Sequence, residues 1–258
     1  MSYHPDRADW LLNPRHYARM LALTRLLAPY FRPTWSGLEV LRGDRGMLLV
    51  ANHGLLGLDL PLLQLGIHDF AGRPLRSFSD RVLFVVPPVR AALTGMGVCE
   101  GTPAVAQRVL ARGELAFTCP GGAREALAPK RDRYKLQWAG RYGFVRSAIR
   151  AGAPIVPVAI LGSAETYHQL ADAETVRRTA LGRLIARHLG EKYVPPLYLG
   201  LGPLPLPQRM RFFVGEPIEV PADPALANDE TTVRDLHARA QRQTERLLGE
   251  RMVSDIGI

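Results

Sequence analysis

The chain has 258 residues, of which 47% are apolar, and a formal net charge of +9 at neutral pH. This length and apolar content allow one large α/β domain, or two small ones, with a packed core. The two cysteines, Cys99 and Cys119, are too few for a disulfide framework and lack metal-ligand spacing, and no apolar run approaches the roughly 18 to 20 residues of a membrane span. The sequence therefore argues against a disulfide scaffold, a metal-stabilised module and a membrane-spanning protein. A reducing cytoplasm is the expected setting.

An amphipathic, basic helix is predicted near the N-terminus. Asn13 and Pro14 form a cap and a first turn, and apolar residues then recur at helical spacing, interleaved with arginines, to about residue 28. Such a helix can pack on the rest of the protein or lie in a membrane interface, and both roles stay open. Because no linker follows, we predict a helical segment over residues 1–35, a candidate for membrane association, and one domain over residues 36–258.

Strands and helices alternate along the remaining chain. Strands are predicted near residues 37–42, 46–51, 114–119 and 209–215, and residues 143–162 predict a helix, a glycine turn and a strand. Helices are predicted to open near Asp59 and at Thr102-Pro103, and to cover residues 174–190 and 231–252; residues 194–208 predict a proline-broken apolar loop. The pattern predicts an α/β fold with a central mixed sheet flanked by helices, plus the N-terminal amphipathic helix and a C-terminal helix.

Most of the net charge lies in one short segment. Residues 124–150 hold eight basic residues against Glu125 and Asp132, a local balance of +6. Such a run can be a solvated face, or it can contact an anionic membrane surface, a phosphate-bearing substrate or nucleic acid. No helix-turn-helix, zinc or RNA-binding motif accompanies the run, so nucleic acid is the least favoured partner.

The stretch LLVANHGLLGLDLPLL, residues 48–63, places a histidine and an aspartate among glycines directly after a predicted buried strand. Taken alone, His53 is a hydrogen-bonded core histidine and Asp59 is a helix N-cap. Taken together, they lie at the carboxyl end of a strand, where α/β folds build their sites, and a carboxylate within reach would fix the histidine tautomer. This pair is a candidate general base with the residue that orients it.

A second stretch, TCPGGAREAL at residues 118–127, also follows a predicted strand. Its Pro-Gly-Gly turn exposes backbone N–H groups, and Arg124 offers a two-pronged donor to an anion or a carbonyl oxygen, although a plain strand-to-helix turn would look the same. A third stretch, APIVPVAILG, contains Pro157 within a strand pattern, which favours an edge strand or a bulge.

In this order and at these separations, the three stretches resemble the glycerophospholipid acyltransferase superfamily over about residues 45–168. His53 and Asp59 match its histidine-aspartate motif, Pro120-Gly121-Gly122 its proline-glycine block, and residues 156–158 its last block. Five residues separate the histidine from the aspartate, where the commonest motif has four. That spacing, with PGGAREAL, YKLQW and GFVRSAIRAGAPIVPVAILG, resembles the phytyl ester synthase and diacylglycerol acyltransferase-like branch.

The resemblance implies an O-acyltransferase that needs no metal or other cofactor. His53 would accept the proton of a lipid hydroxyl as that oxygen attacks an acyl thioester, carried by coenzyme A or an acyl carrier protein, and Asp59 would hold the ring. Backbone donors of the proline-glycine turn would stabilise the oxyanion. The implied substrate-binding residues are Asn52, Gly121, Gly122, Arg124 and Glu125. A peripheral enzyme on the cytoplasmic face of an anionic membrane would suit these substrates.

Departures from the superfamily pattern bear on the acceptor. Members that read a phosphate carry an arginine in a second block and a glutamate in the proline-glycine block, whereas this chain has GMGVCEGTP and Gly121 at those places. A neutral hydroxyl acceptor is therefore favoured, unless Arg124 or Glu125 compensates. An acyl thioesterase, an inactive lipid-binding member of the fold and, last, a nucleic-acid-binding protein are the alternatives.

Overall fold

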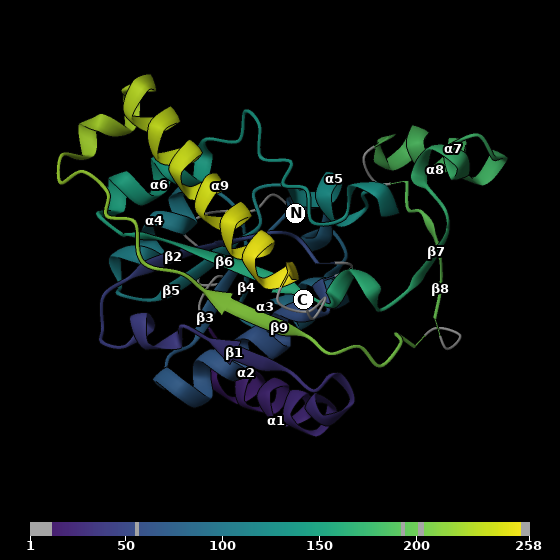
Figure 1. The fold of residues 1–258 in the computed structure, drawn as a ribbon, viewed down its shortest axis with the longest axis horizontal. Helices are drawn as coiled ribbons and strands as arrows, with labels where there is room; N and C mark the ends of the chain where they lie inside the picture. Colours follow the sequence, from purple (N-terminus) through teal and green to yellow (C-terminus); the bar gives the residue numbers. More distant parts are fainter. Residues whose placement is uncertain (1–11, 55–56, 192–193, 201–203, 254–258) are drawn as a thin grey trace.

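The computed structural model describes residues 12–54, 57–191, 194–200 and 204–253. Within these residues, the centre of the fold is a seven-stranded, mostly parallel sheet (Figure 1). β9 is antiparallel to its neighbour β6, so the sheet is mixed, as predicted. In spatial order the strands are β1 (Thr34–Ser36), β9 (Arg211–Val214), β6 (Ile155–Leu161), β2 (Met47–Ala51), β5 (Leu115–Thr118), β3 (Leu75–Ser79) and β4 (Val98–Glu100).

Helices cover both faces of this sheet, and alternate strand residues divide between two apolar cores. Leu49 of β2 points into the core under α1 (Pro14–Phe31) and α2 (Asp59–Ala71). Leu48 and Val50 point into the core on the other face, which α9 crosses diagonally (Figure 1). The helices on that second face are α4 (Pro103–Ala111), α6 (Gly143–Ala151) and α9 (Glu230–Val253). The predicted α/β fold is therefore confirmed.

The N-terminal helix begins as predicted and runs three residues further. The Asn13 side chain caps α1 by accepting hydrogen bonds from the N–H groups of the first turn, and the helix passes through Pro29 to Phe31. One side of α1 is buried on α2, whereas four large apolar side chains of the other side, Leu23, Leu26, Leu27 and Tyr30, are exposed. In the described part of the chain, every helix falls short of the combined length and apolar character that crossing a bilayer requires.

The predicted strand near residues 37–42 is wrong. Gly37, at a φ of +77°, turns the chain directly after β1, and residues 38–41 form a 3-10 helix, η2 (Leu38–Leu41). The three-residue repeat of this helix places Leu38 and Leu41 on one side, where both are buried. The apolar residues that suggested a strand therefore form the buried side of a single helical turn.

Pro157 lies in the centre of the sheet, so of the two predicted alternatives the edge strand is wrong and the bulge is the one that fits. β6 has β2 on one side and β9 on the other. Proline is tolerated here because the ladder to β9 begins only at Val158, while Ile155 forms an isolated bridge with Ile218. Between these two pairings, two residues of β6 lie opposite three residues of the segment that follows β9. At this bulge-like irregularity no backbone N–H is required from Pro157, which has none.

The chain between β6 and β9 builds a second, two-stranded sheet that projects from the side of the body (Figure 1). Its strands are β7 (His168–Ala171) and β8 (Leu197–Leu199), with α7 (Ala173–Arg177) and α8 (Ala180–Leu189) between them. The single helix predicted over 174–190 is divided at Thr179, whose hydroxyl caps α8 by accepting from the Gly182 N–H at 3.1 Å. The remaining helices are α3 (Pro87–Gly95) and α5 (Gly122–Ala126).

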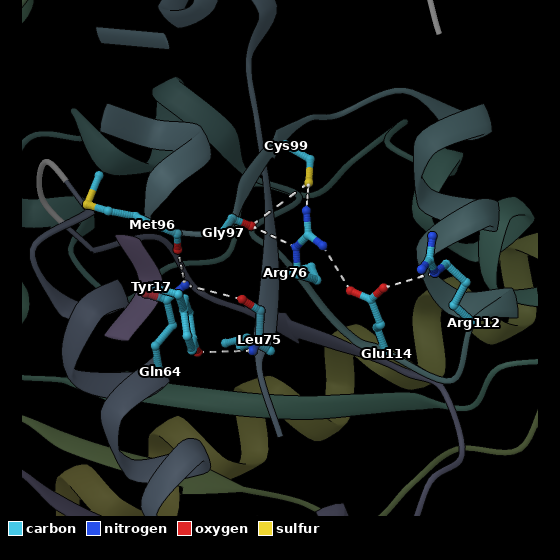
Figure 2. Close-up of polar contacts among 9 residues, drawn as sticks. All are labelled: Tyr17, Gln64, Leu75, Arg76, Met96, Gly97, Cys99, Arg112 and Glu114. Atoms are coloured by element: carbon cyan, nitrogen blue, oxygen red, sulfur yellow. Dashed lines mark hydrogen bonds and ion pairs between the residues drawn. The ribbon is translucent and has the colours of Figure 1, made fainter. Parts of the chain in front are cut away.

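A buried arginine ties the far strands of the sheet together (Figure 2). The guanidinium of Arg76 on β3 donates to the Gly97 carbonyl at 3.2 Å, to Glu114 Oε2 at 2.9 Å and to Cys99 Sγ at 2.9 Å. Only 1% of the Arg76 side chain is exposed, so these partners replace water. The network fixes β3 and β4 beside the start of β5 and lies away from the residues discussed next.

Candidate active site

Asn52 sets the point at which β2 ends. Its side-chain nitrogen donates to the Ile160 carbonyl and its side-chain oxygen accepts from the Ile160 N–H, both at 2.8 Å. The amide group therefore continues the pairing of β2 with β6 by one more residue, and the side chain is buried. The polar atoms that the sequence assigned to substrate are used within the sheet.

His53, the next residue, is held at two points. Its backbone N–H donates to Glu125 Oε1 at 2.6 Å, and its ring Nδ1 lies 2.7 Å from the Gly54 carbonyl oxygen. Because a carbonyl only accepts, Nδ1 carries the proton of the neutral ring, which leaves the Nε2 lone pair free. The sequence predicted that a carboxylate would fix this tautomer, whereas in the structure the Gly54 carbonyl does so.

Asp59 is the first residue of α2, and its carboxylate packs against Gly54. A Cβ at Gly54 would lie 2.6 Å from Asp59 Cγ, and closer still to Asp59 Oδ2 and Ser163 Oγ, so only glycine fits. Burial raises the pKa of Asp59, while the charge of His53, the first N–H groups of α2 and the neighbouring Ser163 hydroxyl lower it. The Ser163 hydroxyl has no partner in good hydrogen-bond geometry among the described residues. Among the described residues, the interaction of Asp59 with His53 is thus one of charge, without a hydrogen bond between the two side chains.

Glu125 braces the site from α5. Besides the His53 N–H, its carboxylate accepts the Gln137 N–H at 3.0 Å, and burial raises its pKa. The carboxylate folds back over Gly121, where a Cβ would lie 2.6 Å from both Cβ and Cδ of Glu125. Glu125 thus occupies the space beside Gly121 and holds the His53 backbone, with both carboxylate oxygens engaged.

The proline-glycine turn offers fewer free donors than the sequence suggests. Gly122 has a φ of +55°, and its N–H donates to the Cys119 carbonyl at 3.0 Å. The Gly121 N–H has no hydrogen-bond partner within the part of the chain that the structure describes. Arg124 is exposed, one residue from the buried Glu125. The structure thus leaves Gly121 as the remaining backbone donor of this turn.

A small cavity of about 30 Å³ lies beside His53, with room for one or two water molecules. Its walls bring together three of the predicted residues, Asn52, His53 and Glu125, while Gly121, Gly122 and Arg124 lie outside the lining. The other lining residues are Ala126, Ala128, Arg133, Tyr134, Ser163, Ala164, Gln169 and Tyr198. In the sequence, Arg133 stands out only as one charge of the basic run, and Tyr134 only as part of the YKLQW block. Gln169 and Tyr198 lie on β7 and β8, outside the motifs.

Among the lining residues, Tyr134 is held by two hydrogen bonds of its hydroxyl group. It adopts a φ of +62°, and its hydroxyl donates to Glu165 Oε2 at 2.6 Å and accepts from the Gly162 N–H at 2.9 Å. Burial, reinforced by the charge of Glu165, raises its pKa. Tyr134 therefore stays protonated, and its donor is already engaged.

The basic run is not one free cationic face. Lys135 pairs with Asp132 at 2.8 Å, and Arg146 pairs with Glu230 at 2.5 Å. Arg133 has no acidic partner among the described residues, and its guanidinium donates to the Tyr167 carbonyl at 3.5 Å. Within the same residues, no group of three or more His, Cys, Asp or Glu side chains is arranged to hold a metal ion.

The profile of the family described as Diacylglycerol acyltransferase matches residues 74–251, more than half of the chain. The chain belongs to this family. The predicted resemblance to the acyltransferase superfamily, and to its diacylglycerol acyltransferase-like branch, is therefore confirmed. The matched range begins after His53 and Asp59, so the roles of these two residues rest on the geometry described above.

Relatives and a solved structure agree with this assignment. An uncharacterized protein of Mycobacterium tuberculosis is 38% identical over 210 residues, 76% of this chain and 56% of the relative. The Gallus gallus protein named "DGAT1/2-independent enzyme synthesizing storage lipids" is 30% identical, over 78% of this chain and 57% of the relative. The Homo sapiens protein of the same name is 28% identical, over 75% of this chain and 55% of the relative. The chain thus spans about half the length of these relatives.

The fold is shared with the crystal structure of the 1-acyl-sn-glycerophosphate (LPA) acyltransferase PlsC from Thermotoga maritima. The TM-score is 0.54 at 17% sequence identity, and the alignment covers 93% of this chain and 85% of that chain. At this identity the likeness concerns architecture, and it places the mixed sheet described above among acyltransferase folds.

Proposed function

We propose that the protein transfers a fatty acyl group from an acyl thioester, carried by coenzyme A or an acyl carrier protein, to the hydroxyl group of a lipid, with His53 as general base. The observation that carries this proposal is the state of the ring: the Gly54 carbonyl holds the proton on Nδ1, and Nε2 of His53, a residue of the cavity wall, has no hydrogen-bond partner among the described residues. A free Nε2 on a ring held in one orientation is what proton abstraction from a hydroxyl requires.

The reaction then follows from the positions of the side chains. Nε2 accepts the hydroxyl proton as the acceptor oxygen attacks the thioester carbonyl carbon, and the C–S bond breaks when the tetrahedral intermediate collapses. The imidazolium returns its proton to the thiolate that leaves. The buried carboxylate of Asp59 stabilises the imidazolium through charge, and the Gly121 N–H is the proposed donor to the oxyanion. Glu125 holds the His53 backbone in place throughout.

Among acceptors, we propose a neutral hydroxyl such as that of a partial glyceride or a long-chain alcohol. Glu125, which sequence reasoning considered as a substitute phosphate contact, is buried with both oxygens engaged, and Arg124 is outside the cavity lining. Arg133 is the cation of the cavity wall and is the residue that would read a phosphate if one were bound. Exposed Arg124 and its basic neighbours remain the proposed contacts for a coenzyme A phosphate or an acidic carrier protein.

We place this chemistry at the cytoplasmic face of an anionic membrane, with residues 1–35 as the first contact. Supporting this, α1 carries an exposed apolar side of four large residues together with several arginines. Each basic residue near an anionic surface contributes about 1 kcal/mol, so a few are enough for reversible binding. Residues 36–258 form the proposed acyltransferase domain.

Thioester hydrolysis is the second candidate, because the cavity as it stands has room for water and not for a lipid. One experiment separates the two: the purified protein is given labelled acyl-CoA with a panel of alcohols, partial glycerides and lysophospholipids, and products are resolved from free fatty acid. Ester that disappears in His53→Ala but persists in His16→Ala, an exposed histidine on α1, supports transfer. Free acid alone, with every acceptor, would replace transfer by hydrolysis.

A further inference from the structure

The two-stranded sheet beside the cavity has its polar and apolar faces reversed. Gln169 and Tyr198 are paired across β7 and β8, and both line the cavity beside His53. The leucines of the two strands are largely exposed: Leu170, at the register shift between Gln169 and Ala171, at 59%, Leu197 at 54% and Leu199 at 50%. A sheet that packs on a protein body normally turns its apolar face inward and its polar face to solvent. Here the arrangement is the opposite.

The helices that join these strands continue the apolar surface. Leu181 and Leu184, one turn apart on α8, are exposed, as is Leu189 at its end. Together with Leu204, seven large apolar side chains are exposed among the described residues of the range 170–204, whereas none is exposed over residues 90–169. Exposed apolar side chains gathered in this way mark a surface that meets another apolar phase or a partner. We call β7, α7, α8 and β8 the flap.

We propose that the outer face of the flap docks into the interface of an anionic lipid bilayer and brings the bilayer to the wall of the His53 cavity. Charge favours lipid as the occupant, since α8 carries Arg183 and Arg187, has no acidic residue, and neither arginine forms an ion pair with a described residue. Arg187 lies one turn from Leu184, at the edge of the apolar side, where a guanidinium reaches lipid phosphates while leucines enter the acyl region.

The chain just after the flap contacts α1, which carries another exposed apolar side of the molecule. The Tyr30 hydroxyl on α1 donates to the Pro205 carbonyl at 2.6 Å, just past the end of the flap. This hydrogen bond joins α1 to the chain that follows the flap. The part of this inference that concerns access to His53 rests on the proposed function, because it takes the acceptor to be a lipid that reaches the cavity from the bilayer.

The first test reports on docking alone and needs no catalysis. An environment-sensitive fluorophore is attached at Leu170→Cys or Leu199→Cys, with Arg239→Cys on the far helix α9 as the matched exposed control. Unsubstituted protein carried through the same labelling sets the background from Cys99 and Cys119. Vesicles contain equal parts of phosphatidylcholine and phosphatidylglycerol. We expect a blue shift and quenching by brominated lipid at both flap positions and none at position 239. Labels that stay in a water-like environment, or protein that binds no vesicle, would overturn the proposal.

The second test connects docking to the reaction. In the triple variant Leu170→Asp/Leu197→Asp/Leu199→Asp, we expect vesicle partition to fall by at least about tenfold, because three leucines no longer leave water. The double variant Arg239→Glu/Arg242→Glu on α9 controls for added negative charge, and thermal unfolding confirms that each variant is folded. Ester formation from a vesicle-borne acceptor should fall with partition, while ester formation from a dispersed short-chain alcohol should not.

The outcomes of this second test separate the two proposals. If wild-type protein forms no ester with any acceptor, the proposed function fails while docking is still judged by fluorescence. If the triple variant binds vesicles like wild type, docking through this face is refuted whatever the activity. If wild type is a dimer without lipid and the triple variant a monomer, the face is an interface between two copies and the bilayer proposal is wrong.

Discussion

Gly121→Ala is the substitution whose effect the structure specifies most sharply. Gly121 has a φ of −62° and a ψ of −29°, a conformation that alanine adopts freely, so the backbone itself presents no obstacle. The new methyl group would instead lie 2.6 Å from Cβ and Cδ of Glu125 and closer still to Oε2. Because Cβ belongs to the fixed part of the side chain, rotation of Glu125 cannot relieve the contact. The Glu125 carboxylate must therefore move away from the two N–H groups whose hydrogen bonds it accepts.

The cost follows from those two hydrogen bonds. Glu125 accepts from the N–H groups of His53 at 2.6 Å and Gln137 at 3.0 Å. Hydrogen bonds to charged groups contribute about 1.5–3 kcal/mol each, so we expect Gly121→Ala to lower the free energy of unfolding by about 3–6 kcal/mol. The neighbouring Gly122→Ala is the matched control: its φ of +55° costs alanine about 1–2 kcal/mol, and the nearest atom, Nη1 of Arg141 at 3.1 Å, belongs to a flexible side chain.

Equilibrium unfolding in urea measures these values, and a double-mutant cycle tests their cause. Glu125→Gly removes the three atoms nearest to the new methyl group, so adding Gly121→Ala to that background should cost less than about 1 kcal/mol. Turnover should fall in Gly121→Ala by more than stability alone explains, because the His53 backbone loses its anchor. If Gly121→Ala costs no more than Gly122→Ala, or if its cost is unchanged in the Glu125→Gly background, this account of Glu125 is wrong.

Three further expectations concern the reaction and the sheet. His53→Ala should lower ester formation by at least about 10²-fold in a folded protein, and Asp59→Asn should be milder, because the base remains present; steady-state rates on matched samples decide both. Neutral acceptors should outcompete lysophosphatidic acid in one reaction mixture, and if they do not, Arg133→Ala should remove the preference for the phosphorylated acceptor. Arg76→Ala should lower the free energy of unfolding by about 3–5 kcal/mol, since Glu114 and the Gly97 carbonyl lose their partner. A loss below about 1 kcal/mol would contradict the network drawn in Figure 2.

Much of the fold could be predicted because its signals are local. The cap at Asn13-Pro14, the helix that opens at Asp59 and the helix that follows Thr102-Pro103 all begin where the sequence indicates. The terminal helix buries Val233, Leu236, Ala240 and Leu248, as its spacing predicts. In each case the residues that determine the element lie within one or two turns of one another.

The parts that could not be predicted depend on distant residues. The local rule allows Pro157 at an edge or in a bulge, and only the departure of the chain after β9 decides for the bulge and makes a central position tolerable. Gln169 and Tyr198 reach the cavity because β7 pairs with β8, nearly thirty residues later, through a segment that resembles an apolar loop. In the sequence, Arg133 is one of eight basic residues in the run, and only the folded structure shows that it is the one that lines the cavity. No local pattern marks these outcomes.

The glycines of the candidate site show the same distinction within single residues. Sequence reasoning treats glycine as a source of backbone freedom, and Gly57 and Gly122 do have positive φ values. Gly54 and Gly121 do not; they are required because a carboxylate occupies the place where their Cβ would be. The Asp59 carboxylate packs on Gly54 beside His53, and the Glu125 carboxylate passes over Gly121 to accept from the His53 N–H. Because glycine has no side chain, each of these two loops lets a carboxylate come close to the same histidine. A methyl group at either position would leave the motif intact in the sequence and displace a carboxylate from His53.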